Sequence, residues 1–350
     1  MSATETDAGL TNGRRRVTLA EIAAAANLSL ATVSKVLNGR TDVSAATRSK
    51  VEALLHEHGY LRRNSGSGTA QMVEVVFHEL ESEWAIEIIR GVERVAREFN
   101  LSVLLTESGD RHTPGPGWID GVLRRRPLGV VLVFSTLSAA SKQKLRSRGV
   151  NFVVVDPAGQ PDPDVASIGS ANWSGGFAAA QHLIDLGHTR IGMISGPEDM
   201  LCSVARVDGY RSALERSGIP FNPDLVRVGD FHVASGQQAG ESLLSMTEPP
   251  TAIFAGSDLQ ACGVYEAARL LGRRVPEDLS VVGYDDLRLA RWVGPPLTTI
   301  RQPLTEMAET AVRLLLRMGE ELDPTLSSQR VDLATSLVVR ESTRPPQAGA

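Results

Sequence analysis

Apolar residues near the start of the chain recur every three or four positions, the spacing of amphipathic helices. The first such stretch is 19–26. Thr18 and Glu21 at its start have the spacing of a capping box, in which each side chain satisfies a backbone N–H that the helix leaves free. Ser29 is a favourable N-cap for a second stretch over 30–37. The pattern therefore predicts two short helices joined by a tight turn.

A third helix is predicted from Ser44 to near Gly59, with Val51, Leu54 and Leu55 on one face. Two short helices that are joined by a tight turn and braced by a third form the helix-turn-helix arrangement. Its second helix enters the major groove of DNA, so the side of that helix turned away from the core approaches bases and phosphates. A three-helix scaffold that docks on another protein has the same spacing and is the alternative interpretation.

Beyond residue 72 the pattern changes to short apolar strands that alternate with amphipathic helices, as in parallel doubly wound α/β sheets. The alternation occurs twice, which predicts two similar lobes with a ligand crevice at the carboxyl ends of the strands. The predicted strands are 73–77, 101–106, 129–134 and 152–156, then 190–195, 226–228, 251–256 and 279–286; the predicted helices are 89–99, one near 124, 175–186, 206–217 and 259–271.

Length and composition agree with more than one folded unit. The chain has 350 residues, of which 42% are apolar, and this is long enough for a small module and a two-lobed domain. Runs of 18 or more apolar residues and the apolar core of a secretory signal are both lacking, so we expect a cytoplasmic protein. Cys202 and Cys262 lack the paired spacing of metal sites or disulfide frameworks, and both are expected to be buried thiols.

Charge is distributed unevenly along the chain. The net charge is −5, yet residues 14–63 carry nine basic and four acidic groups, so this stretch is +5 and the remainder is −10. A small basic unit on an acidic body indicates that only the first part meets a polyanion such as DNA. A solvated basic surface is the alternative that charge alone leaves open.

Residues 17–60, which contain the run ATVSKVLN, closely resemble the headpiece of the lactose/galactose-repressor family. The segments LGHTRIGMISGP (186–197), VPEDLSVVGYDD (275–286) and PLTTIRQP (296–303) resemble the same family and its periplasmic sugar-binding relatives. The resemblance implies a homodimeric, sequence-specific DNA-binding transcriptional repressor without a cofactor or metal. A small ligand between the lobes, expected to be a sugar, would control its affinity for a pseudo-palindromic operator. An activator, or a response to a non-sugar metabolite, is the alternative.

The resemblance also implies which residues meet DNA. Leu30 and Ala31 take the positions where the family reads bases, whereas Lys35 replaces the more usual arginine. Lysine cannot form a bidentate fork with guanine, so the base contact there is expected to differ. The complete set of expected DNA contacts is Thr18, Ser29, Leu30, Ala31, Thr32, Ser34, Lys35, Asn38, Arg62 and Arg63.

The linker departs from the family, whose members follow the headpiece with a hinge helix that inserts a leucine into the minor groove. Gly66 and Gly68 each disfavour a helix by about 1 kcal/mol relative to alanine, so we expect a flexible tether with Arg62 and Arg63 on phosphates. The expected divisions are a disordered tail 1–15, headpiece 16–61, linker 62–72, effector-binding and dimerisation domain 73–341 (lobe 1 about 73–168 and 298–325, lobe 2 about 169–297 and 326–341), and tail 342–350.

Sugar sites combine planar hydrogen-bonding groups with an aromatic face for the C–H surface of the ring. The family's motifs imply that the planar guanidinium of Arg206 donates paired hydrogen bonds to the sugar and that the Phe231 ring stacks on it. Asp285 and Asp156 are expected to accept hydrogen bonds from its hydroxyls. Asp258 belongs to a strand-end position where the preceding residue departs from the family. The loop after the first strand adds Glu79, Glu81 and Trp84, although Glu81 also fits a helix N-terminal charge.

Two other classes share parts of this pattern. Paired carboxylates can hydrolyse glycosides, but the sequence contains no Gly-x-Ser-x-Gly, Gly-x-x-x-x-Gly-Lys or His-Glu-x-x-His motif, so we expect no enzyme. A solute-binding protein of a transporter fits the body equally well. The headpiece and the missing secretory signal favour the regulator.

Overall fold

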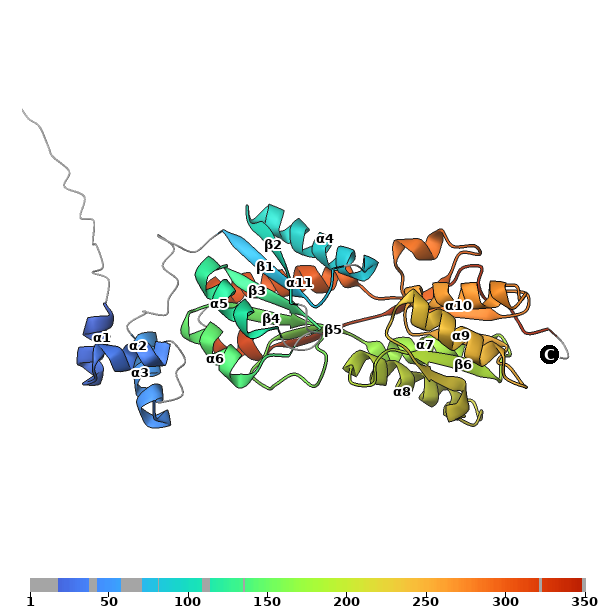
Figure 1. Cartoon of the computed structure of the whole chain (residues 1–350), viewed down its shortest axis with the longest axis horizontal. Helices are drawn as coiled ribbons and strands as arrows, with labels where there is room; N and C mark the ends of the chain where they lie inside the picture. The colour runs from blue at the N-terminus through green and yellow to red at the C-terminus, as the bar shows by residue number, and fades with distance from the viewer. Residues whose placement is uncertain are drawn as a thin grey trace, which may run out of the picture. The chain divides into compact units, whose positions relative to one another are not determined.

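A computed structural model gives the structure of the chain (Figure 1). It describes residues 18–37, 43–57, 71–80, 82–108, 114–134, 136–320 and 323–347. The chain divides into two compact units, one of residues 1–68 together with 139–149 and the other of residues 69–138 together with 150–350. The expected N-terminal tail and residues 62–70 of the expected linker lie outside the described residues.

The first unit contains the three predicted helices, α1 (Leu19–Ala26), α2 (Leu30–Leu37) and α3 (Ala45–Glu57). The axis turns by 107° between α1 and α2, as expected for a helix-turn-helix. Ile22, Val33 and Val51 are among the buried residues that join the three helices in one small core. The side chains at 54 and 55 belong to the same cluster, as the pattern predicts.

Among the described residues no single helix has the length and apolar character needed to cross a membrane, whereas α1 and α2 meet that criterion jointly as one bent pair.

The second unit contains two six-stranded sheets, as the double alternation predicts. The first sheet has the order β11-β5-β4-β3-β1-β2, and every described pairing in it is parallel. Its middle strands over 129–133 and 151–155 are almost purely apolar, as expected for strands whose two faces are both covered by helices. The strands are β1 (Met72–Phe77), β2 (Ser102–Glu107), β3 (Gly129–Val133), β4 (Asn151–Val155), β5 (Ser167–Ser170) and β11 (Arg330–Leu333).

The second sheet has the order β12-β10-β9-β8-β6-β7. Its pairings are parallel except for the edge strand β12, which runs antiparallel to β10. The strands are β6 (Ile191–Ser195), β7 (Val226–Val228), β8 (Ala252–Ala255), β9 (Ser280–Asp285), β10 (Thr298–Arg301) and β12 (Ser336–Val338).

Amphipathic helices supply the cores of the two lobes. α4 and α11 lie side by side against the first sheet (Figure 1), and their apolar faces share one cluster with β1, β3 and β4. The second sheet has α7 with α8 and α9 with α10 as neighbouring pairs. The helices of the second unit are α4 (Glu83–Glu98), α5 (Pro116–Arg125), α7 (Asn172–Asp185), α8 (Leu201–Arg216), α9 (Val233–Leu244), α10 (Asp258–Leu270) and α11 (Leu304–Glu320), with short 3-10 turns η1 (Pro223–Leu225), η2 (Arg288–Arg291) and η3 (Pro324–Ser328). The helix α6 (Ala139–Ser147) groups with the first unit.

The chain passes between the lobes three times, and the crossings differ from the expected lobe boundaries. The sequence predicts that 298–301 belongs to lobe 1, but β10 pairs with β9 in the second sheet, so the return to the first lobe follows Arg301. Conversely, the sequence predicts that 330–333 belongs to lobe 2, but this segment pairs with β5 in the first sheet. Backbone hydrogen bonding to distant strands decides both assignments, which local composition does not reveal.

Candidate functional site

The exposed face of α2 is the candidate nucleic-acid interface. Val33, Val36 and Leu37 are buried, whereas Leu30 is 52% exposed and Lys35 is exposed. The apolar side of α2 is therefore turned to the core, as predicted, and the opposite side carries a mixture of small, polar and basic groups. That is the composition with which a recognition helix approaches base edges and phosphates.

Two of the expected DNA contacts have a structural role at helix starts. Thr18 and Glu21 form the capping box, with the Thr18 amide donating to the Glu21 carboxylate over 2.6 Å. The Ser29 hydroxyl accepts from the Thr32 amide over 3.1 Å. Asn38, Arg62 and Arg63 lie outside the described residues. The remaining expected contacts, Leu30, Ala31, Thr32, Ser34 and Lys35, all lie on α2 and are exposed or half-buried.

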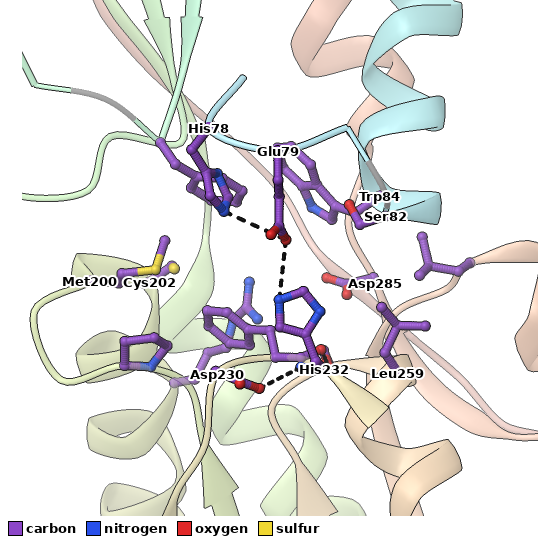
Figure 2. Close-up of a pocket in the computed structure, with 16 residues that line it drawn as sticks. His78, Glu79, Ser82, Trp84, Met200, Cys202, Asp230, His232, Leu259 and Asp285 are labelled. Carbon is purple, nitrogen blue, oxygen red and sulfur yellow. Dashed lines mark hydrogen bonds and ion pairs between the residues drawn. The ribbon is translucent and has the colours of Figure 1, made fainter. Parts of the chain in front are cut away.

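A cavity of about 290 Å³ lies in the second unit, at the carboxyl ends of strands from both sheets. This is the position where open α/β folds bind ligands, because loops from several strands meet there. Figure 2 shows its walls. The lining residues are His78, Glu79, Ser82, Trp84, Phe134, Pro197, Met200, Cys202, Arg206, Asp230, Phe231, His232, Ser257, Leu259, Asp285 and Leu287.

Arg206 on α8 forms part of the cavity wall and is 3% exposed. Its Nε donates to Asn172 Oδ1 over 2.9 Å, and one terminal nitrogen donates to the Gly256 carbonyl over 2.6 Å. Its guanidinium lies 3.7 Å from the centre of the Tyr284 ring. These contacts hold the guanidinium in one orientation, which lowers the entropy cost of binding a polar ligand with it.

Asp285 terminates β9 and lines the same cavity. Its φ of 114° is unusual for a residue with a side chain, and Gln302 donates to its Oδ1 over 2.6 Å. Burial raises the pKa of Asp285 to about 7, although the positive charge of Arg206 opposes the rise. A buried carboxylate next to a guanidinium can accept from hydroxyl groups of a ligand.

Aromatic side chains enter the cavity from both lobes. Trp84 and Phe134 of the first lobe pack together with ring centroids 4.5 Å apart. Phe231 of the second lobe has φ 72°, and its ring lies directly over Gly196. A Cβ at Gly196 would lie 2.0 Å from the Phe231 ring, so this glycine permits the close approach. Such faces suit the C–H surface of a sugar ring or another flat ligand.

A polar cluster from the two lobes closes the outer part of the cavity. Glu79 Oε1 lies 3.1 Å from Nε2 of His232 and 3.6 Å from Nε2 of His78 (Figure 2). The His232 backbone is held in turn by Asp230, whose Oδ1 accepts from the His232 amide over 2.9 Å. The structure thus brings Glu79 to the site, as expected, and adds two histidines as its partners.

Two expected ligand contacts, Asp258 and Asp156, do not line the cavity. Both oxygens of the fully buried Asp258 are used internally, since they accept from Thr299 Oγ1 over 2.5 Å and from the Leu287 amide over 2.7 Å. Asp156 is 3% exposed at the end of β4, and its Oδ2 has no hydrogen-bond partner among the described residues. Burial raises its pKa to about 6. Glu81 lies outside the described residues.

Sequence reasoning missed several lining residues, including Phe134, Asp230 and His232. Their positions in the segments that follow β3 and β7 were the available signal, because parallel strands end at a common edge. Cys202 is buried as expected and lines the cavity, and burial raises the pKa of its thiol to about 12. Cys262 is half-buried rather than buried.

Known families match both units. Residues 18–63 match bacterial regulatory proteins of the lacI family, and residues 180–343 match a periplasmic binding protein-like domain. The HTH-type transcriptional repressor CytR of Escherichia coli (strain K12) is 34% identical over 93% of this chain and 96% of its own length.

Solved structures of related regulators have the same fold. A complex of the transcriptional regulator CelR with cellobiose is 34% identical, with a TM-score of 0.70 over 93% of this chain and 100% of that one. The lac repressor dimer bound to operator and the anti-inducer ONPF is 28% identical, with a TM-score of 0.68 over 94% and 100% of the two chains. The helix-turn-helix, the two-lobed α/β domain and these relatives together show that the chain belongs to the lacI family of bacterial regulatory proteins.

Proposed function

We propose that this regulator is a repressor that binds a pseudo-palindromic operator as a homodimer and changes its operator affinity when a sugar-like effector occupies the cleft. The observation that carries the proposal is the cavity wall, which contains the buried Arg206 and Asp285 and in which the Arg206 guanidinium lies 5.4 Å from the centre of the Phe231 ring. Planar hydrogen-bonding groups next to an aromatic face are the combination that sugar hydroxyls and ring C–H groups require.

The headpiece supports the DNA-binding half of the proposal. Leu30 and Ala31 contact bases, Thr32 and Ser34 contact bases or backbone, and Lys35 makes a contact that discriminates between sequences without a bidentate fork. Arg62 and Arg63 add contacts to phosphates. One headpiece buries too little surface for specificity within a genome, so a two-fold dimer on a two-fold operator doubles the contact. A DNA partner supports a cytoplasmic location for the protein.

The relatives support an effector of the sugar class. The CelR structure contains cellobiose, and a regulator from Enterococcus faecium, 27% identical, was solved with bound ribose. In this chain Asp285 and Arg206 hold the ring hydroxyls, while Phe231 and Trp84 contact the ring faces. The carboxylates of the cleft act as hydrogen-bond acceptors and not as catalysts of glycoside hydrolysis.

A footprint of the protein on genomic DNA, followed by binding to the recovered sites, tests this function. We expect a few two-fold symmetric sites, a dimer by sedimentation both free and on DNA, and release or tightening by a sugar that is bound without being hydrolysed. A monomer on DNA, binding without sequence preference, or turnover of a glycoside would each contradict the proposal.

A further inference from the structure

The acidic body of the chain contains one strongly basic stretch. Residues 121–155 carry seven basic groups and no acidic one, so this stretch is +7. Everything outside 14–63 sums to −10, so without 121–155 it would be −17. A concentration of positive charge attracts a polyanion, and it modifies the expectation that only the headpiece meets DNA. The basic residues are Arg124, Arg125, Arg126, Lys142, Lys144, Arg146 and Arg148.

The fold brings the two halves of this stretch together. α5 leads into β3 and α6 leads into β4. The first residues of these strands, Gly129 and Asn151, are paired in the first sheet, where neighbouring strands lie about 4.8 Å apart. Basic residues stand three and five positions before each member of this pair: Arg124, Arg126, Arg146 and Arg148.

These four arginines, named the basic edge, are all exposed. Two other basic residues of the stretch are not available on the surface in the same way. Arg125 is used inside the first lobe, since its Nε donates to the fully buried Glu74 over 3.0 Å. Lys142 is 8% exposed. The charge that solvent and a large partner can reach is therefore concentrated on the basic edge.

The linker from the headpiece enters the first lobe at the same place. Met72 is the first residue of β1, and its carbonyl accepts from the Leu128 amide over 2.8 Å. Leu128 stands two residues after Arg126. A flexible tether of eleven residues, the length of the expected linker 62–72, spans on average roughly 17–20 Å. The tether therefore keeps this part of the lobe near DNA that the headpiece holds.

Contacts within the first unit lead to the same arrangement. α6 groups with the headpiece, and the Ser147 hydroxyl of α6 donates over 2.7 Å to the carbonyl of Leu37, the last residue of α2. The amide oxygen of Gln143, in the orientation that faces α3, accepts from Arg48 Nε over 3.3 Å. The helix that leads to Arg146 and Arg148 therefore lies beside the helix proposed to enter the major groove.

We propose that the basic edge is a second DNA-binding surface, which contacts phosphates next to the headpiece and adds affinity without reading sequence. The inference rests on the proposed DNA-binding function and extends the interface into the domain that binds the effector. Arginine suits this role, because its planar guanidinium binds a phosphate through two parallel hydrogen bonds.

DNA-binding titrations of the full-length protein at several salt concentrations test the inference. One variant combines Arg124→Gln with Arg126→Gln, and the other combines Arg146→Gln with Arg148→Gln. Each is expected to weaken binding to operator recovered from genomic DNA and to random DNA by a similar factor of about three to ten. The slope of log K against log salt should become shallower by about one to two, because each phosphate contact contributes about 0.9.

Arg269→Gln combined with Arg274→Gln is the matched control. It removes the same charge from two side chains of the second lobe that are 68% and 67% exposed. We expect both DNA affinities to stay within about twofold of the unaltered protein and the salt slope to stay the same. Circular dichroism of each variant confirms that a loss of affinity does not result from unfolding.

Losses no larger than those of the control, or an unchanged salt slope, would overturn the inference while operator binding by the unaltered protein upholds the proposed function. A loss confined to operator DNA would also overturn it, because contacts to phosphates act on any duplex. If the unaltered protein shows no preference for operator, the proposed function fails, and the titrations on random DNA still decide the inference.

Discussion

Asp285 is placed for binding at a cost to folding. Burial raises its pKa to about 7 from the ordinary 3.8, so the folded protein disfavours the charged form that accepts from ligand hydroxyls. Because the pKa in the folded state lies above that in the unfolded state, stability contributed by the protonated form is present at low pH and is lost as the pH rises toward 7.

Asp285→Asn should therefore stabilise the protein above neutral pH. Asparagine keeps an oxygen that accepts from Gln302 and carries no charge to desolvate. We expect the free energy of unfolding to increase by roughly 1–3 kcal/mol at about pH 8 and much less at about pH 5, with loss of effector binding at both. Urea unfolding of both proteins at the two pH values measures this. An equal increase at both pH values would show that Asp285 does not titrate as described.

Substitution of Lys35 on α2 is expected to affect affinity for operator DNA more than affinity for random DNA. Lys35→Ala should weaken binding to operator by about 1–3 kcal/mol and binding to random DNA by distinctly less, because a base contact is lost together with one charge. Mobility-shift titrations on both DNAs give the two values. Arg269→Ala, which removes a charge on α10 outside the headpiece, is the control. Equal losses on the two DNAs would assign Lys35 to the phosphates.

At the scale of elements, strong local signals were sufficient for the headpiece and most strands. The capping box of Thr18 and the apolar face of 30–37 required only neighbouring residues, and both predictions are confirmed. The pattern does not predict α6, α9 or α11, nor the strand β5, whose sequence SIGS has a single large apolar residue. β5 exists because β4 and β11 pair with its two sides.

The site was less accessible to sequence reasoning than the fold. The family's strand-end motif implies that Asp258 lies in the cleft, but Thr299 and the Leu287 amide, distant in sequence, occupy its oxygens. His232 and Glu79 meet only because two lobes bring together loops separated by more than half the effector domain. Contacts of this kind depend on tertiary arrangement and have no periodic signal in the chain.

The close approach of Gly196 to Phe231 links a turn after β6 to the stacking platform. A Cβ at this position would overlap the Phe231 ring, so Gly196→Ala should displace the ring and weaken the effector by about tenfold or more, while operator binding without effector is retained. Gly159→Ala is the control, because open space surrounds Gly159. Titration calorimetry measures the effector affinity of the two variants. Unchanged affinity in Gly196→Ala would exclude Phe231 as a ligand contact.

The linker is the element in which the sequence differs most from its family. Because Ser65, Gly66 and Gly68 replace the hinge-helix sequence of the family, we expect little bending of the operator and a weakly specified central step. Arg62→Ala combined with Arg63→Ala should weaken operator and random DNA by similar factors and reduce the salt dependence by about two counterions. A strong central kink, or a loss confined to operator DNA, would mean that the linker orders into a hinge.

At the scale of the whole molecule, regulation requires that ligand and DNA favour different states of one protein. A ligand shifts that balance only by the difference between its affinities for the two states, and the coupling acts equally in both directions. In this chain the cleft lies between two lobes, each built on one sheet, and three chain crossings connect the lobes. Closure of the lobes around a ligand therefore changes the position of the two sheets relative to each other. The effector site and α2 belong to separate units, which permits one to be altered without the other.

The most direct test of this account is the operator affinity of the full-length protein and of Arg206→Ala, each with and without saturating effector. For the unaltered protein we predict that effector changes the operator Kd by about tenfold or more, which is a typical coupling. For Arg206→Ala we predict an operator Kd within about threefold of the unaltered protein and no response to effector. An effector that occupies the cleft without changing the operator Kd, or a folded Arg206→Ala protein that no longer binds operator in the absence of effector, would contradict the account.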